Sequence, residues 1–401
     1  MMTGNSMTAR TQPADKKASP IPGSAARWNA AAWALWLVPL LVISIAVVAK
    51  PGNHSLTSLY QDAVARWWSR KTLYAGPGGM NYLPQFTLFF SPYYFLGQAA
   101  GDILWRGTAA AGLALGILLF CRAPALAGRP RAFFWVSLLA MPLCLQALQF
   151  GQANAHLAAA LLLAAWCLSV QRWWAAVVFL GLATAIKPLG IAAIGLAWAA
   201  YPRLWWRLGV GLALLLALPF AFGPPGYVWS QYLACADNLR QCSAVTEHRF
   251  ADLNGLLRTF GIALGSQASL LVRATAGMLL MVLCWGFARR HPEPLRALVW
   301  LGATAGFLML FNPMTEANSY AVVAPVLGLV AWWSFTRGER TVGGILAGAA
   351  LSMGLLPEPL RPLFGNYFAL AWYPAMTLGF LGLLAWMASR PPSGSEVLRG
   401  P

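Results

Sequence analysis

Few residues in this chain have side chains that could do chemistry, and the first of them is an acid. Asp62 lies in the segment SLYQDAVARWWSRKTLYAG, whose apolar residues recur at helical spacing. That spacing predicts an amphipathic helix over residues 55–72 that lies at a membrane surface with Asp62 on its polar face. A carboxylate held at the mouth of a membrane cavity can act as a general base. The alternative is a solvated acid paired with Arg66.

Two further motifs bring uncharged and cationic groups. FGQANAH turns between two apolar segments and presents Gln152 and Asn154, whose amides donate and accept hydrogen bonds and suit sugar hydroxyls or a phosphate. A polar helix cap explains them equally well. AIKP places Lys187 at the end of an apolar segment, where ionisable residues are functional by default and a phosphate is a natural partner. Snorkelling of Lys187 to the interface is the alternative.

The remaining polar motifs come later in the chain. FADLNGLLRTFG contains Asn254 and Arg258, and its amphipathic pattern predicts a helix along the membrane surface. Arg258 could bind a lipid phosphate or make only ordinary contacts with anionic lipids. FNPMTEANSY interrupts two apolar segments and leaves Glu316 and Asn318 at one end of them. Capping by Thr315 explains that turn, but it does not explain an acid there.

Other chemistries lack their signatures in the sequence. It has no Asp-x-Asp pair for a metal and a nucleotide sugar, no Gly-Lys of a P-loop and no His-Glu-x-x-His. No cysteine or histidine cluster has metal-ligand spacing, so we expect neither a metal nor another cofactor. The six cysteines are too scattered for a disulfide framework. Only Cys235 and Cys242 share a predicted loop, and they could pair in an oxidising compartment.

The elements that must position these residues follow from composition. Of the 401 residues, 59% are hydrophobic and 10% are charged, whereas a soluble protein of this size has roughly a quarter of its residues charged. The apolar runs repeat from end to end, which predicts an all-α polytopic membrane protein and excludes a nucleic-acid partner. The net charge of +17 comes mostly from Lys and Arg in short loops, where these residues set membrane topology.

About twelve (10–12) transmembrane helices are predicted within a single domain over residues 28–390, between a disordered tail at 1–27 and a short tail at 391–401. Interfacial helices are expected in the two long loops, 51–99 and 223–262. The predicted spans are approximately residues 30–48, 100–121, 132–149, 154–170, 174–186, 189–201, 208–222, 267–288, 297–311, 318–335, 341–356 and 368–388.

Charge predicts how this bundle sits in a cell inner (plasma) membrane. Most Lys and Arg fall in alternate short loops and in the tails, so the positive-inside rule makes both termini cytoplasmic. The polar candidates then all lie on the other side of the membrane, which predicts one extracytoplasmic site. They are Asp62, Gln152, Asn154, His156, Lys187, Glu247, His248, Asn254, Glu316 and Asn318.

The order of these motifs resembles glycosyltransferase family 87. This family of class C membrane glycosyltransferases includes the polyprenol-phosphate-mannose-dependent mannosyltransferases of phosphatidylinositol mannoside synthesis. The resemblance covers residues 55–325 and is carried by an Asp in the first outside loop followed by a Leu-Tyr, then by FGQANAH, AIKP, NGLLR and NPMTEANSY. Its most specific part is GQxN followed by an intramembrane IKP.

The resemblance implies a helix bundle whose interfacial helices cover a lateral groove, and a reaction without a metal. A polyprenyl phosphate sugar would enter from the bilayer and a lipid or glycan acceptor from the outer face. Asp62 matches the position of the family's catalytic aspartate, and it would take the acceptor's proton as the hydroxyl attacks the anomeric carbon with inversion. Lys187 and Arg258 would stabilise the departing phosphate. The substrate-binding residues would be Gln152, Asn154, Asn254, Glu316 and Asn318.

The resemblance makes mannose the expected sugar, with arabinose or another pentose as the alternative, and glycolipid biosynthesis in the cell envelope the expected setting. Some family members carry histidine around the last motif, where this chain has Asn318, and that departure bears on the substrate. Two other functions remain open: a lipid-linked glycan polymerase or ligase, and a lipid or solute transporter. The sequence shows no inverted repeat of the kind common in transporters, and it favours the transferase.

Overall fold

The structure is a computed structural model that describes residues 24–51, 55–74, 79–123, 129, 131–243 and 250–390. Most of the predicted N-terminal tail, the predicted C-terminal tail, Glu247 and His248 lie outside the described residues. In the part that is described, all regular elements are helical. They are α1 (Ser24–Ala49), α2 (Thr57–Trp68), α3 (Gln85–Phe95), α4 (Gln98–Cys121), α5 (Ala132–Gln149), α6 (Ala153–Ser169), α7 (Trp173–Ile186), η1 (Pro188–Gly190), α8 (Ile191–Ala200), η2 (Pro202–Leu204), α9 (Trp205–Ala217), η3 (Leu218–Ala221), α10 (Pro225–Ser243), α11 (Leu253–Thr259), α12 (Ser266–Arg290), α13 (Leu295–Phe311), η4 (Ala317–Val322), α14 (Ala324–Thr336), α15 (Arg340–Leu355), α16 (Pro357–Phe364) and α17 (Tyr367–Ser389).

Six of the described helical segments are long and apolar enough to cross a membrane, as expected of a membrane protein. They are α1, α4, α5, α9 with its flanking 3-10 turns, α12 and α17. The pair α15 and α16, bent by 60°, would make a seventh. Each of the other predicted spans overlaps a shorter apolar helix of 10–17 residues, which rises only about 15–26 Å against a hydrocarbon core of about 30 Å. The predicted count of twelve is not confirmed.

The two long loops contain more helix than the sequence predicts. The amphipathic patterns correspond to α2 and α11, but α3 lies in the first loop and the 19-residue α10 in the second. Helix α10 mixes aromatic, small and polar residues in PGYVWSQYLACADNLRQCS, so it lacks the apolar stripe from which surface helices are recognised.

Helix α6 forms the centre of the core. Nearly all of its residues are buried, because a helix that is apolar all round must be enclosed by others. Two glycines of α4 allow α4 to approach α6 closely. A Cβ at Gly112 would lie 2.9 Å from the Cβ of Ala159, and one at Gly116 would lie 2.6 Å from Leu162. This is the small-xxx-small packing typical of membrane helices.

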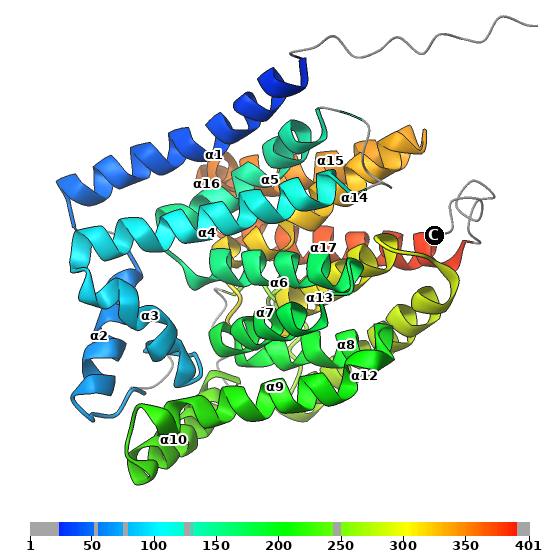
Figure 1. Cartoon of the computed structure of the whole chain (residues 1–401). Coiled ribbons are helices and arrows are strands. Elements are labelled where there is room, and N and C mark those ends of the chain that lie inside the picture. Colours follow the sequence, from blue (N-terminus) through cyan, green and yellow to red (C-terminus); the bar gives the residue numbers. More distant parts are fainter. Residues whose placement is uncertain are drawn as a thin grey trace, which may run out of the picture.

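The outer helices have the opposite character. Most of the apolar window of α12, and of the segment that contains α9, is exposed, and α1 exposes a row of large side chains that includes Leu37, Leu41 and Ile45. Apolar faces of this size suit contact with lipid. Figure 1 shows that α2, α3 and α10 gather at one end of the bundle, whereas the described chain ends, at the start of α1 and the end of α17, lie toward the other.

Candidate active site

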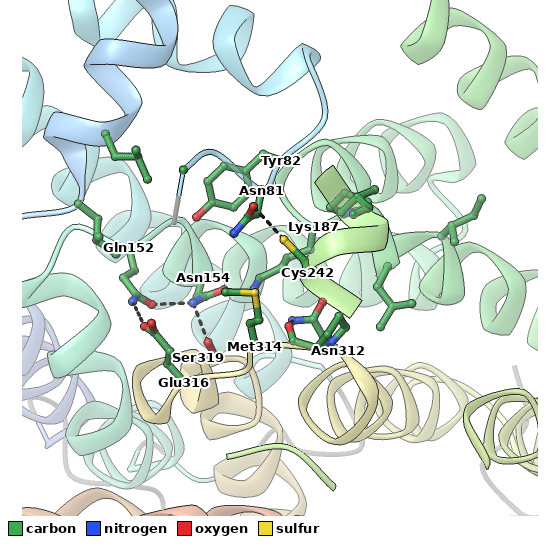
Figure 2. Close-up of a pocket in the computed structure, with 18 of the residues that line it drawn as sticks. Asn81, Tyr82, Gln152, Asn154, Lys187, Cys242, Asn312, Met314, Glu316 and Ser319 are labelled. Carbon is green, nitrogen blue, oxygen red and sulfur yellow. Dashed lines mark hydrogen bonds between the residues drawn. The ribbon is translucent and has the colours of Figure 1, made fainter. Parts of the chain in front are cut away.

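A cavity of about 600 Å³ opens near the end of the bundle where α2 and α10 lie. That volume is within the range of pockets that hold small molecules. Four of the motifs predicted from the sequence supply its walls, and Figure 2 shows how the side chains converge. The described lining residues are Leu56, Leu59, Gly79, Asn81, Tyr82, Gln152, Asn154, Lys187, Pro188, Leu189, Ile191, Leu239, Cys242, Arg273, Asn312, Pro313, Met314, Glu316 and Ser319.

A hydrogen-bond network joins two of these motifs across the cavity wall (Figure 2). The Nε2 of Gln152 donates to Oε2 of Glu316 at 3.1 Å. The Nδ2 of Asn154 donates to Oε1 of Gln152 at 2.6 Å and to Oγ of Ser319 at 3.0 Å. Because Asn154 occupies the carbonyl oxygen of Gln152, the amide of Gln152 is fixed with its NH₂ group toward Glu316. The network therefore orients a carboxylate at the cavity.

Lys187 reaches the cavity from a break in the fold. Helix α7 ends at Ile186 because the following proline disfavours helical backbone at Lys187, which is extended with φ −129° and ψ 112°. Burial lowers the pKa of Lys187, and the nearby charge of Glu316 acts in the opposite direction. No ion pair within 4.0 Å joins Lys187 to a carboxylate in the described chain. Its ammonium group therefore has charge to offer to a ligand.

A second cation in the cavity was missed by the sequence analysis. Arg273 lines the wall from α12. The signal was present, because an arginine one-third of the way along an apolar span is costly and is functional by default. Among the described lining residues the charged groups are Lys187, Arg273 and Glu316. Two cations against one carboxylate make the cavity net positive, which favours an anionic ligand.

Asp62 lies elsewhere. Its side chain is 57% exposed, and it accepts a 2.6 Å hydrogen bond from Nε of Arg66, one helical turn along α2. The face that α2 turns to the cavity carries Leu56 and Leu59 instead. The structure thus holds the solvated ion pair that the sequence analysis left open. The role of Asp62 as a general base stays a prediction.

Three other predicted residues also lie outside the described lining. Asn254 donates through Nδ2 to Oγ of Ser269 at 3.1 Å, and Nε of Arg258 donates to the carbonyl oxygen of Asn254 at 3.1 Å. Both belong to α11 and its contact with α12. Asn318 is half-buried, and its Oδ1 is buried without a partner in the structure. Their predicted roles in binding substrate or phosphate are not tested by this arrangement.

Two tyrosines missed by the sequence analysis connect α2 to this site. The backbone N–H of Ala153 donates to the hydroxyl of Tyr60 at 3.1 Å, and that hydroxyl lies 3.1 Å from the hydroxyl of Tyr82 in the cavity wall. Burial raises the pKa of Tyr60 to about 12, so the phenol stays neutral at physiological pH. The pair gives the wall a polar but uncharged patch beside Gln152.

Neither a disulfide nor a metal site forms in the described part of the chain. All six cysteines are free and buried. Cys235 and Cys242 both lie on α10; seven residues apart, their Cα atoms are separated by about 10 Å along the axis, beyond the roughly 7 Å limit for a disulfide. The suggested pairing is therefore not made. The described residues contain no group of three His, Cys, Asp or Glu side chains that could hold a metal ion.

Comparison with known proteins agrees with the motif order. No curated protein and no solved structure matches the chain. The sequence model of Glycosyltransferase family 87 matches residues 81–313, more than half of the chain. The matched region contains Gln152, Asn154, Lys187 and Arg273; it begins after Asp62 and ends shortly before Glu316. The chain belongs to glycosyltransferase family 87.

Proposed function

We propose that this membrane glycosyltransferase moves a sugar, mannose by family, from a polyprenyl phosphate carrier to a hydroxyl of a lipid or glycan acceptor. One observation carries the proposal. One cavity is lined by two cations, Lys187 and Arg273, and by a carboxylate, Glu316, that a glutamine orients. In such a site the cations can stabilise the negative charge that grows on the leaving phosphate, and the carboxylate can take the proton of the acceptor hydroxyl.

The cations suit the leaving group. When the bond between the anomeric carbon and the phosphate oxygen breaks, negative charge grows on the lipid phosphate. Lys187 offers a point charge, and Arg273 offers a planar fork that matches phosphate oxygens. The net positive charge of the described lining also favours a donor with a phosphate over a neutral sugar.

The remaining wall suits a lipid. Leu189, Ile191 and Leu239 line the same cavity as Lys187, and Ile191 is 52% exposed. An isoprenoid chain attached to the phosphate would find apolar contacts there and continue toward the exposed side. This arrangement supports a polyprenyl carrier over a water-soluble sugar phosphate.

Glu316 is our proposed general base. It would accept the proton of the acceptor hydroxyl while the hydroxyl oxygen bonds to the anomeric carbon. The bond between the anomeric carbon and the phosphate oxygen breaks on the opposite face, so the configuration inverts. Gln152 keeps one carboxylate oxygen in place, and Oε1 and Oε2 together can both accept a hydrogen bond and receive a proton. Asp62, which the family resemblance suggests, is the alternative base.

The reaction would take place on the extracytoplasmic side of the inner membrane. Helix α5 begins beside Arg131, in a loop predicted to be cytoplasmic, and ends at the turn before Gln152. Arg337, at the end of α14, lies in another loop predicted to be cytoplasmic. An impermeant thiol reagent applied to intact cells should label Asp62→Cys, which lies on an exposed face. Labelling only after cell lysis would reverse this orientation.

Transfer of label tests the proposal. Purified protein would be given polyprenyl phosphate carrying radiolabelled mannose, together with extracted native lipids. We expect transfer by wild type, a large loss in Lys187→Gln and Arg273→Gln, and no loss in Arg122→Gln, which changes an exposed arginine at the far end of α4. Transfer only from a pentose carrier would correct the sugar, and transfer only from a lipid-linked oligosaccharide would favour a polymerase or ligase. No transfer from any lipid phosphate sugar would overturn the proposal.

A further inference from the structure

A buried ion pair lies behind the cavity rather than in it. Asp102 and Arg106 are one turn apart on α4, with side-chain exposures of 0% and 1%. Neither residue lines the cavity. Charges are expensive to bury, and removing one partner of such a pair leaves the other uncompensated. A charged pair inside an apolar helix therefore needs a structural reason for its presence.

The hydrogen bonds of Arg106 supply that reason. Its Nη1 donates to the carboxylate and to the backbone oxygen of Asp102, and its Nη2 donates to Oγ of Ser55 at 3.1 Å. The same Nη2 also donates to the carbonyl oxygen of Gln149 at 2.9 Å, and Nε donates to that of Leu148 at 2.8 Å. All five N–H donors of the guanidinium are used.

These bonds belong to a set that fixes one turn. The last carbonyls of a helix have no partner within it, and α5 ends at Gln149. Arg106 donates to the carbonyl oxygens of Leu148 and Gln149. The backbone N–H of Leu56 donates to the carbonyl oxygen of Phe150 at 2.9 Å, and Nε1 of Trp105 donates to the carbonyl oxygen of Gly151 at 2.8 Å. Four consecutive carbonyls are thus held from outside the turn.

The turn itself leaves no freedom at Gly151. Its φ is +62°, a conformation that favours glycine. A Cβ there would lie 2.9 Å from Thr57 and 3.0 Å from the guanidinium carbon of Arg106. The next residue is Gln152, whose amide binds Glu316. The orientation of the carboxylate therefore depends on a turn that α4 holds in place.

We infer that Arg106 is a positioning residue of this site: it holds the Leu148–Gly151 turn so that Gln152 presents its amide to Glu316. Lysine cannot replace it, because one ammonium group cannot supply the planar fork that binds the carbonyls of Leu148 and Gln149 while it also pairs with Asp102. Asp102 keeps the guanidinium in place and compensates its charge. Trp105 holds the same turn at its last carbonyl.

A double-mutant cycle tests this inference, which rests on the proposed function for its activity readout. Arg106→Lys should lower kcat/KM by about a hundredfold, as expected for a displacement of roughly 1 Å, and Gln152→Ala should lower it similarly. If Arg106 acts through Gln152, the kcat/KM of the double variant should be no lower than that of the less active single variant. Multiplied losses would overturn the inference. Arg122→Lys, at the exposed end of the same helix, is the matched control and should leave kcat/KM unchanged.

A variant that keeps the charges covers the case in which Arg106→Lys does not fold. Trp105→Phe keeps an aromatic ring among Phe86, Phe90 and His156 but removes the N–H that binds Gly151. We expect it to lower kcat/KM by about tenfold and to show the same lack of additivity with Gln152→Ala. An unchanged kcat/KM would count against the inference.

A labelling readout does not depend on the reaction. In a Cys242→Ser background, Gln152→Cys would report where residue 152 points, because it lines the cavity while the other cysteines are buried. Adding Arg106→Lys should change the rate of labelling by a small water-soluble thiol reagent by at least about tenfold, whereas Arg122→Lys should not. An equal rate in both would overturn the inference. If wild type transfers no sugar but labelling changes as expected, the proposed function fails and the positioning role stands.

Discussion

Two acids near the same end of the bundle are held in very different ways. Asp62 lies on the exposed face of α2 and pairs with Arg66, its neighbour one turn along the same helix. Glu316 follows α13, lines the cavity and is bound by Gln152, which is distant in sequence and begins α6. The first acid is positioned by its own helix, whereas the second is positioned by the tertiary fold. A carboxylate that must meet a donor, an acceptor and two cations is better served by the second arrangement.

The largest effect should come from the carboxylate in the cavity. Glu316→Gln keeps the shape and most hydrogen bonds but cannot accept a proton, so we expect transfer to fall by about 10²–10⁴-fold. The rate would be measured with the radiolabelled donor under saturating acceptor. Glu358→Gln, which changes an exposed acid on α16, is the matched control. Full activity of Glu316→Gln would remove this residue from the chemical step.

The cations should come next. Lys187→Gln and Arg273→Gln each remove one charge from the cavity, and we expect losses of about 10²-fold each, because each developing charge on the phosphate loses a stabilising partner. Binding of the donor, followed by thermal shift, should weaken in both. If the loss appears with a neutral analogue of the donor as well, the role of these residues is structural rather than electrostatic.

Removal of the orienting amide should have a smaller effect. Gln152→Ala leaves Glu316 in the cavity without its hydrogen bond, so we expect about a 10–100-fold loss in kcat with little change in unfolding temperature. Gln152→Glu would place a second carboxylate against Glu316 and should be worse than alanine. An alanine variant as active as wild type would show that the network does not orient the acid.

The smallest effect should come from Asp62. Exposed ion pairs contribute about 0–1 kcal/mol, so Asp62→Asn should shift the unfolding temperature by little and leave transfer within a few-fold of wild type. Asp237→Asn, which changes an exposed acid paired with Arg240 on α10, provides the comparison. A loss of transfer in Asp62→Asn alone would show that α2 moves or that the acceptor binds on its outer face.

Much of the fold could be predicted from sequence because apolar length is a local property. Every predicted span overlaps a helix, and the amphipathic patterns of α2 and α11 correspond to helices. Helix α3 was missed because its apolar run of 11 residues is too short to cross a membrane. Helix α10 was missed because packing, rather than an apolar stripe, holds its mixed sequence in place.

The site shows where local inference ends. Gln152, Asn154, Lys187 and Glu316 could each be named from residue type and spacing, but their meeting in one cavity depends on how four distant segments pack. Arg273 and Arg106 were missed because both lie inside apolar spans that were taken as uniform. The Asp102–Arg106 spacing of one turn was a readable signal for a buried pair.

Rescue of a truncated acid by an external carboxylate distinguishes Glu316 from Asp62 as the general base. Glu316→Ala and Asp62→Ala would be assayed side by side for sugar transfer, with and without formate, a carboxylate small enough to enter the space that truncation leaves. We expect Glu316→Ala to be inactive and to regain measurable transfer with formate, and Asp62→Ala to be active without formate and unaffected by it. If Asp62→Ala is instead inactive and rescued by formate while Glu316→Ala retains transfer, the general base is Asp62 on α2 and Glu316 has no part in proton transfer.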